Sequence, residues 1–391
     1  MSTAVLTRSR PPIVGWLAVT TLTLGIFAIV TSEILPIGLL TTIAADFGVS
    51  EGTAGLTMTL PGVVAAVAAP AVTLATARLD RRVMLCALMV VLALADVLAA
   101  VASAYWVMLV SRVLVGLTIG GFWSIGAGLA ARLVPARSVG TATALIFSAV
   151  PLGSVLGVPA GTLIGHVAGW RTAFVALAVL SAVVLAALLV LVPPLPARQV
   201  TSARVLRDLL RGRGTRVALL ATALVVLAHF GTYTYVTPFL EQVTGLDPAS
   251  VSAALLAYGV AGIAGNFVAG RAVAVAPRGT FAAAGCLIAA ATLLLPVAGT
   301  RAGGAFALLV LWGLAYGAVP VCSQAWFARA APHAPEAATV VFTSSFQATF
   351  ALGALLGGVV VDAFSVSAVM VCGALAALLM AASLGRLGRS G

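Results

Sequence analysis

Apolar runs of about 20 residues recur along the whole 391-residue chain, and each is long enough to cross a ~30 Å hydrocarbon core as a helix. Only 8% of the residues are charged, against about 25% in typical soluble proteins. The runs lack the period-two alternation of membrane β-barrel strands. The sequence therefore predicts an all-α integral membrane protein, and little else is compatible with this composition.

Charged or Pro/Gly-rich stretches divide the chain into twelve expected transmembrane helices. These helices are expected at 13–40, 53–77, 83–103, 105–131, 141–165, 172–194, 217–242, 250–275, 280–299, 303–330, 337–361 and 364–386. The first run is longer than the apolar core of a signal peptide, so we expect it to be retained. Six helices fall in an N-terminal bundle at 1–195 and six in a C-terminal bundle at 217–391, joined by a linker at 196–216.

The arginines predict the orientation in the membrane. The net charge is +11, lysine is absent, and 18 of the 21 arginines fall in segments on one side of the expected helices. By the positive-inside rule that side is the cytoplasm, so both termini are expected there, in a bacterial inner membrane. Because these arginines lie between spans, we expect no nucleic-acid partner. The four cysteines form no CxxC pair, so neither a disulfide framework nor a metal site is expected.

The linker 196–216 carries an amphipathic pattern. Leucines and valine at 205, 206, 209 and 210 share a helical face opposite arginines at 204, 207 and 211. This pattern indicates a short interfacial helix on the inner leaflet. The alternative is a disordered polar linker.

The two halves of the chain repeat with a constant offset of 197 residues. Gly48 then falls on Gly245 and Arg81 on Arg278, and "ARLVPA" at 131–136 falls on "ARAAPH" at 328–333. Parallel six-helix repeats are a transporter architecture, with the binding site between the halves. We therefore expect two six-helix bundles related by a pseudo-twofold axis.

Several motifs resemble those of the major facilitator superfamily over the whole chain. They are "SEILPIGLL", "IAADFGVS", "RLDRR", "SRVLVGLTIGGFWSIGAGLAARLVP", "LGSVLGVPAGTLIG", "GWRTAF" and "AHFGTYTYVTPF". Within the superfamily the chain is similar to the twelve-helix drug:proton antiporters, particularly bacterial sugar-efflux and purine-nucleoside-efflux members. The resemblance implies the major facilitator fold and transport by alternating access, with no cofactor beyond the proton gradient.

The fifth expected helix resembles the antiporter motif associated with exporters. Its members here are Gly153, Gly157, Pro159, Gly161 and Gly165. Glycines at four-residue spacing let helices approach closely, and the proline bends the span because it lacks a backbone donor. Plain helix packing without directional meaning is the alternative.

The loop after the second expected helix resembles the family's gating motif only in part. Arg78, Arg81 and Arg82 are present, but Ala77 stands at the usual acidic position and Asp80 near the usual glycine. Such arginines could pair with acids or helix C-termini and hold a gate shut. A simple positive-inside anchor is the alternative.

Three strongly charged side chains lie deep in the expected spans, namely Glu33, Asp96 and Arg112. Asp96 precedes and Arg112 follows the turn near Ala104 by eight residues, so both lie roughly 12 Å from it at 1.5 Å per residue. A buried acid near a buried arginine is less costly than either alone. The resemblance implies Glu33 as the proton-carrying acid and Arg112 as its modulator. A static ion pair, or a purely structural Glu33, is the alternative.

His229 in the seventh expected helix maps onto Ser32 by the 197-residue offset, which would place the two on either side of a central cavity. A histidine there could be a second proton site, a substrate contact or a core residue. The candidate substrate contacts are Ser32, Trp123, Phe147, Tyr233, Tyr258, Trp312, Tyr316, Gln324 and Gln347. They offer aromatic faces and a few hydrogen bonds to an uncharged or amphipathic compound.

We therefore predict a monomeric proton-coupled antiporter that exports a small, drug-like compound. Export of sugars or nucleosides by the same mechanism, and proton-coupled uptake, are alternatives. The sequence shows no phosphate-binding loop or metal cluster, and the intramembrane charges form no nucleophile–base set. We therefore expect neither an ATP-driven pump nor an enzyme.

Overall fold

The computed structural model describes residues 12–76, 78–125, 129–196, 203–330 and 334–387, and every regular element within these ranges is helical. The first half contains α1 (Pro12–Gly38), α2 (Leu40–Phe47), α3 (Glu51–Ala54), α4 (Leu56–Ala75), α5 (Arg81–Ala100), α6 (Tyr105–Ile125), α7 (Ala130–Leu133), the 3-10 helix η1 (Ala136–Ser138), α8 (Val139–Leu152), the π-helix η2 (Gly153–Gly157), α9 (Val158–Ala168) and α10 (Trp170–Leu191). The linker contains α11 (Ala203–Arg211). The second half contains α12 (Arg213–Tyr233), α13 (Val236–Gln242), α14 (Pro248–Val275), α15 (Pro277–Ala298), α16 (Ala302–Ala330), α17 (Pro335–Ala363) and α18 (Val366–Leu387).

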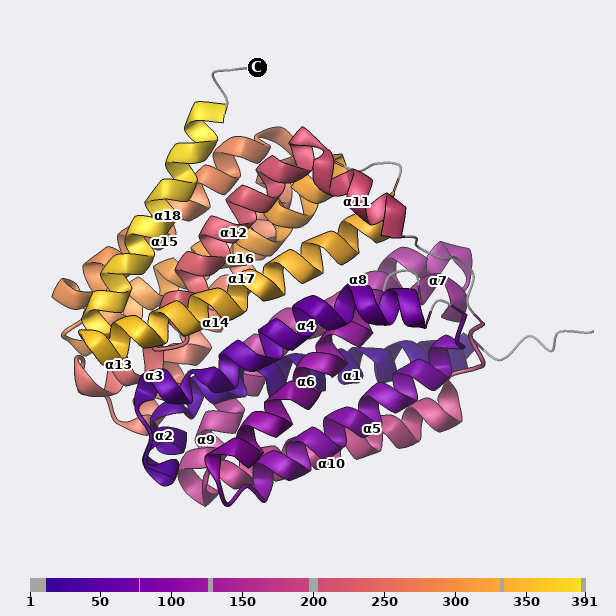
Figure 1. The fold of residues 1–391 in the computed structure, drawn as a ribbon, viewed down its shortest axis with the longest axis horizontal. Coiled ribbons are helices and arrows are strands. Elements are labelled where there is room, and N and C mark those ends of the chain that lie inside the picture. Colours follow the sequence, from indigo (N-terminus) through magenta and orange to yellow (C-terminus); the bar gives the residue numbers. More distant parts are fainter. Residues whose placement is uncertain (1–11, 77, 126–128, 197–202, 331–333, 388–391) are drawn as a thin grey trace, which may run out of the picture.

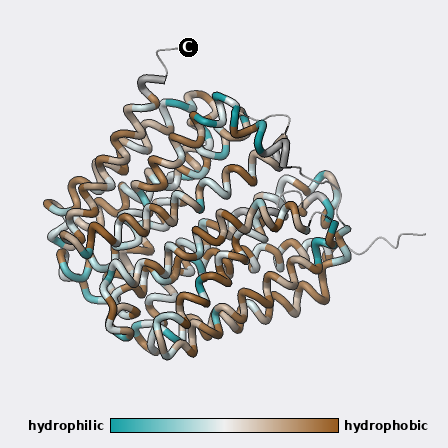
Figure 2. Tube along the Cα trace, in the orientation of Figure 1, coloured by the Kyte–Doolittle hydropathy of each residue, from teal (hydrophilic) through white to brown (hydrophobic). Residues whose placement is uncertain are grey.

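These helices form two bundles, drawn in indigo to magenta and in salmon to yellow in Figure 1. Twelve segments within the described residues are long and apolar enough to span a membrane, which confirms the predicted spans. Apolar residues dominate the helices, and hydrophilic residues gather mainly at the helix ends (Figure 2). The expected all-α fold with twelve spanning helices is therefore confirmed.

Local interruptions are the main difference from the expected helices. The first span ends at Gly38, close to the predicted end, and after a break at Leu39 (φ −117°, ψ 10°) a separate helix, α2, continues to Phe47. The seventh span breaks in the same way between Tyr233 and Val236. The fifth span contains the π-turn η2, which ends two residues before Pro159, whose missing N–H removes one helical hydrogen bond.

The 197-residue repeat extends to the details of the helix ends. Gly48 and Gly245 both adopt left-handed backbone conformations, with φ of 64° and 74°. Two residues later, Ser50 caps α3 by accepting from the Thr53 N–H, and Asp247 caps α14 by accepting from Ala249 and Ser250. The hydrogen bonds from Ser250 are the main reason that the pKa of Asp247 lies below its usual range.

The two bundles meet at the end of the molecule that carries Gly48 and Gly245, which we call the distal face. The opposite end carries α11 and is called the linker face. At the distal face, Asp362 at the end of α17 accepts from Ser50 Oγ at 2.6 Å and from the Gly52 N–H at 2.9 Å. Gln242 of α13 also donates to Glu51 of α3. Side chains from both bundles therefore bond to each other at this face.

Candidate functional site

Three consecutive residues of α1 point to three different neighbours. Thr31 packs on Gly157 of η2, Ser32 bonds to groups of α5 and α6, and Glu33 bonds to α17 in the other bundle. This divergence follows from helix geometry, since each residue turns the side chain by about 100°. The rotation of α1 therefore positions all three contacts together.

Ser32 lies between the two buried charges of the N-terminal bundle. Its hydroxyl donates to Asp96 Oδ1 at 2.6 Å, and Arg112 Nη1 donates to its backbone carbonyl at 2.8 Å. That carbonyl is available because the residue four positions later is Pro36, which has no N–H to donate back. Asp96 and Arg112 are each 0% exposed. They form no direct ion pair, which was the alternative interpretation, and Ser32 bridges them instead.

Further groups complete the surroundings of these charges. Arg112 Nη2 donates to Ser111 Oγ at 2.9 Å, and its guanidinium lies 5.0 Å from the centre of the Phe174 ring. Ser181 of α10 donates to the other oxygen of Asp96 at 3.5 Å. Sequence reasoning missed Ser111, Phe174 and Ser181. The sequence held a signal only for the bond from Arg112 to Ser32, because Pro36, four residues after Ser32, leaves a carbonyl that a buried arginine can use.

Glu33 lies at the interface between the bundles. Its side chain is 8% exposed, and its Oε1 accepts a hydrogen bond from Gln347 Nε2 of α17 at 2.9 Å. Within the part of the chain that the structure describes, no arginine or histidine forms an ion pair with Glu33. Glu33 is therefore a buried acid whose partner is a neutral amide.

His229 is the centre of an aromatic cluster in the C-terminal bundle. We call the cluster formed by His229, Tyr233, Tyr258, Trp312 and Tyr316 the histidine cluster. Trp312 Nε1 donates to His229 Nδ1 at 3.1 Å, and the Tyr258 hydroxyl lies 3.4 Å from Nε2. The Trp312 bond makes Nδ1 an acceptor, so the imidazole carries its proton on Nε2 in this arrangement. His229 is not hydrogen-bonded to Ser32.

Tyr316 is the most accessible member of the histidine cluster. Its ring stacks on the His229 imidazole with centroids 3.4 Å apart and planes 12° apart. Tyr316 is only partly buried, whereas His229 is 1% and Trp312 0% exposed. Tyr316 is therefore the member of the cluster most available to a ligand.

Two of the remaining predicted contacts, Trp123 and Gln324, have no recorded contact with Glu33 or the histidine cluster in the described structure. Trp123 is partly buried against the core of the N-terminal bundle, with its ring edge-on to Phe122. Gln324 is exposed on α16. The side chain of Phe147 lies outside the described part of the chain.

The glycines of the fifth span lie against α1. A methyl group on Gly153, Gly157, Gly161 or Gly165 would contact Val30, Thr31, Leu35 or Leu39, respectively. Pro159 is buried among them at the start of α9. The four-residue spacing therefore lets α1 approach the fifth span closely along its length.

Substitution of Gly157 by alanine is expected to destabilise this contact. The added methyl would overlap Thr31 Oγ1 and approach Thr31 Cβ to 2.9 Å, and overpacking of this kind typically costs about 1–3 kcal/mol. We expect Gly157→Ala to lower the melting temperature of the purified protein. Gly140→Ala is the matched control, because a methyl at Gly140 meets no atom within 4 Å. Equal melting of the two variants would contradict the tight α1 contact.

The arginines of the loop after α4 bind helix C-termini of their own bundle. Arg81 Nη1 donates to the carbonyl of Thr76, the C-cap of α4, at 3.1 Å, and Arg82 donates to the carbonyl of Leu189 in α10. Asp80 caps α5 by accepting from the Arg82 N–H at 2.8 Å. Arg78 is exposed. These bonds hold α4, α5 and α10 together at the linker face.

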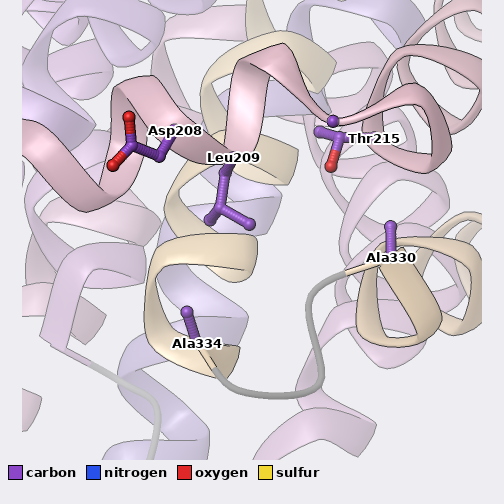
Figure 3. A pocket seen from close by; sticks show the side chains of 6 residues that line it. Asp208, Leu209, Thr215, Ala330 and Ala334 are labelled. Carbon is purple, nitrogen blue, oxygen red and sulfur yellow. The ribbon is translucent and has the colours of Figure 1, made fainter.

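Two cavities lie away from the acid and the histidine cluster. One of about 330 Å³ is bounded by α11, α12 and the ends of α16 and α17, and Leu209 points toward Ala334 in it (Figure 3). The other, of about 290 Å³, lies at the distal face and includes His166 and Glu241. The described residues contain no group of three or more metal-binding side chains.

Comparison with known proteins places the chain among membrane transporters. The family model described as Major Facilitator Superfamily matches residues 22–347. The transcription regulatory protein OpdE of Pseudomonas aeruginosa is 36% identical over 352 residues, covering 89% of this chain and 88% of that protein. The purine ribonucleoside efflux pump NepI of Salmonella paratyphi A is 31% identical over 350 residues, covering 90% and 88%.

A solved structure shares the fold. It is a bacterial homologue of the human lysosomal transporter Spinster in an inward-facing and occupied conformation, with a TM-score of 0.80 at 15% sequence identity. The similarity covers 98% of each chain. The arrangement of both bundles is therefore that of known transporters.

Proposed function

The chain belongs to the major facilitator superfamily, whose members are transporters rather than enzymes, and from that premise we propose that it is a proton-coupled antiporter exporting a small ring-containing compound. It is a multi-pass membrane protein, and its relatives are bacterial. We propose the inner membrane as its location, with the linker face in the cytoplasm, because most of the arginines lie on that side.

Glu33 is the observation on which the proposed coupling rests. It is buried, lies where the two bundles meet, and has a neutral amide as its hydrogen-bond partner. Ionisable groups inside membrane segments are costly, and they commonly mark proton or substrate pathways. Glu33 can lose its proton when the bundles separate and regain it from the other side, which couples proton entry to the motion.

The histidine cluster supports an aromatic or ring-containing substrate. Tyr316 presents a partly exposed ring in the C-terminal bundle, and stacking on such rings is available to any planar heterocycle. The efflux pump named above carries purine ribonucleosides, which combine such a ring with hydroxyl groups. Purine nucleosides are therefore the first class to test, followed by drug-like aromatic compounds and sugars.

Transport by reconstituted protein tests the proposal. Vesicles holding radiolabelled inosine, a drug panel or sugars would be given a proton gradient directed from the distal to the linker face. We expect one compound class to move against the proton flow and its transport to stop when the gradient is dissipated. Movement in the same direction as the protons would establish uptake instead.

Replacement of Tyr316 by leucine is expected to weaken substrate binding. Stacking of a base on an aromatic side chain contributes about 1–3 kcal/mol, so the dissociation constant for a nucleoside should rise about tenfold or more. Titration calorimetry of the purified protein measures this change. Trp106→Leu is the control, because Trp106 is 67% exposed on the outside of α6. Unchanged affinity in the Tyr316 variant would remove the histidine cluster from the binding site.

A ligand-sensing role is the second candidate, because the relative from Pseudomonas aeruginosa is named as a transcription regulatory protein. A sensor would bind its ligand but would not exchange it across a membrane. Counterflow of labelled substrate in vesicles separates the two functions. Binding without counterflow would favour the sensor.

A further inference from the structure

The amide of Gln347 is only half satisfied. Its Nε2 donates to Glu33 Oε1 at 2.9 Å, while its Oε1 is buried and has no hydrogen-bond partner. The side chain as a whole is 5% exposed. Buried polar atoms are nearly always hydrogen-bonded, and an unpaired one is costly. The position of the amide beside an acid indicates where the missing donor can come from.

A protonated carboxyl group and a primary amide are complementary. The acid O–H can donate to the amide oxygen while the amide N–H donates to the acid carbonyl, which gives two bonds between the same two groups. A carboxylate can only accept, so it can take the N–H but cannot satisfy the amide oxygen. Half of this two-bond pair is already formed between Glu33 and Gln347.

We propose that Gln347 senses the protonation state of Glu33 across the bundle interface, forming two hydrogen bonds with the acid and one with the carboxylate. The proposal rests on the proposed role of Glu33 as the proton carrier. Gln347 acts as a positioning residue, because it responds to the proton without carrying it. α1 is thereby held to α17 more firmly when Glu33 is protonated.

No other charged group takes over this role in the described structure. The guanidinium of Arg112 is directed to Ser32 and Ser111, and Asp96 accepts from Ser32 and Ser181. Tyr316 of α16 stacks on His229. α4 and α8 contain no ionisable residue, while α9, α10 and α13 contain only His166, Arg171 and Glu241.

This pairing links the protonation of Glu33 to the separation of the two bundles. With Glu33 protonated, closure buries a neutral pair with no unpaired polar atom. With Glu33 ionised, the same closure buries a charge and leaves the amide oxygen unpaired, and both are unfavourable. Loss of the proton therefore loosens α1 from α17.

Infrared difference spectroscopy of the purified full-length protein, at low minus high pH, tests the proposal directly. We expect a carbonyl band of a protonated carboxyl group that is absent in Glu33→Gln. In Gln347→Met this band should shift to higher wavenumber, because the carbonyl loses its hydrogen bonds. Thr349→Val, two residues away on the same helix, should leave it unchanged.

Glutamine labelled with 13C at the amide carbonyl gives a second readout that needs no change at position 347. Gln242 is labelled too and bonds to Glu51, so it should contribute a pH response in both proteins. The additional response from Gln347 should be present in the wild-type protein and absent in Glu33→Gln. An acid band at the same position in Gln347→Met, or an equal labelled-amide response in the wild-type protein and Glu33→Gln, would overturn the proposal while leaving Glu33 as proton carrier. Absence of any Glu33 acid band across the pH range would overturn the proton-carrier role itself.

Discussion

Glu33→Gln is expected to abolish proton-driven export completely while leaving substrate exchange intact. The glutamine can still bond to Gln347, so the contact between α1 and α17 is preserved in shape. It cannot bind or release a proton, so a proton gradient can no longer drive the substrate across the membrane. Gradient-driven transport in vesicles should fall to the level of protein-free vesicles, and counterflow should persist.

Proton release on substrate addition gives an independent measurement of the same effect. Purified wild-type protein should release protons when the substrate binds, and Glu33→Gln should not. Asp247→Asn is the control, because it makes the same acid-to-amide change outside the spans, at an N-cap where asparagine is equally suitable. Release that persists in Glu33→Gln would move the proton site to Asp96 or His229.

Arg112→Met is expected to have the largest effect on stability. Arg112 is 0% exposed, donates to Ser32 and Ser111, and shares Ser32 as a hydrogen-bond partner with Asp96. Removal of one partner of a buried charged pair typically costs about 3–5 kcal/mol, because the other charge is left uncompensated. The melting temperature in detergent should fall sharply, with loss of monodisperse protein.

A double substitution separates the charge effect from packing. Asp96→Asn with Arg112→Met removes both charges, so it should melt at a higher temperature than Arg112→Met alone. Arg112→Lys should not restore stability, because a single ammonium cannot reproduce the planar fork that reaches Ser32 and Ser111. If the double variant melts no higher than the single one, the two charges are not coupled.

Much of the fold could be predicted because it depends on properties that a sequence displays directly. The length of the apolar runs predicts the membrane-spanning helices. The 197-residue repeat extends to the paired helix caps at Ser50 and Asp247. The four glycines of the fifth span predict a close helix contact, although not that the neighbour is α1. Breaks such as Leu39 are harder to predict, because they depend on the packing at the bundle ends.

The sequence could identify which residues belong to the site, but not which of them pair with each other. Burial cost singles out Glu33, Asp96 and Arg112 from the sequence. Their partners depend on how each helix is rotated, which periodicity does not fix when every face is apolar. The bond from Gln347 to Glu33 joins residues 314 positions apart. Gln347 was therefore predicted as a substrate contact, and its pairing with the acid emerged from the structure.

The divergence of Thr31, Ser32 and Glu33 to three neighbours also limits how the gene can change. An inserted or deleted codon upstream in α1 would turn these side chains by about 100° and move them by about 1.5 Å, so all three contacts would be lost at once. Point substitutions at their partners would remove one contact at a time. Length variation between homologues should therefore be absent from Gly25 to Leu39 and be concentrated in the loops and around α11.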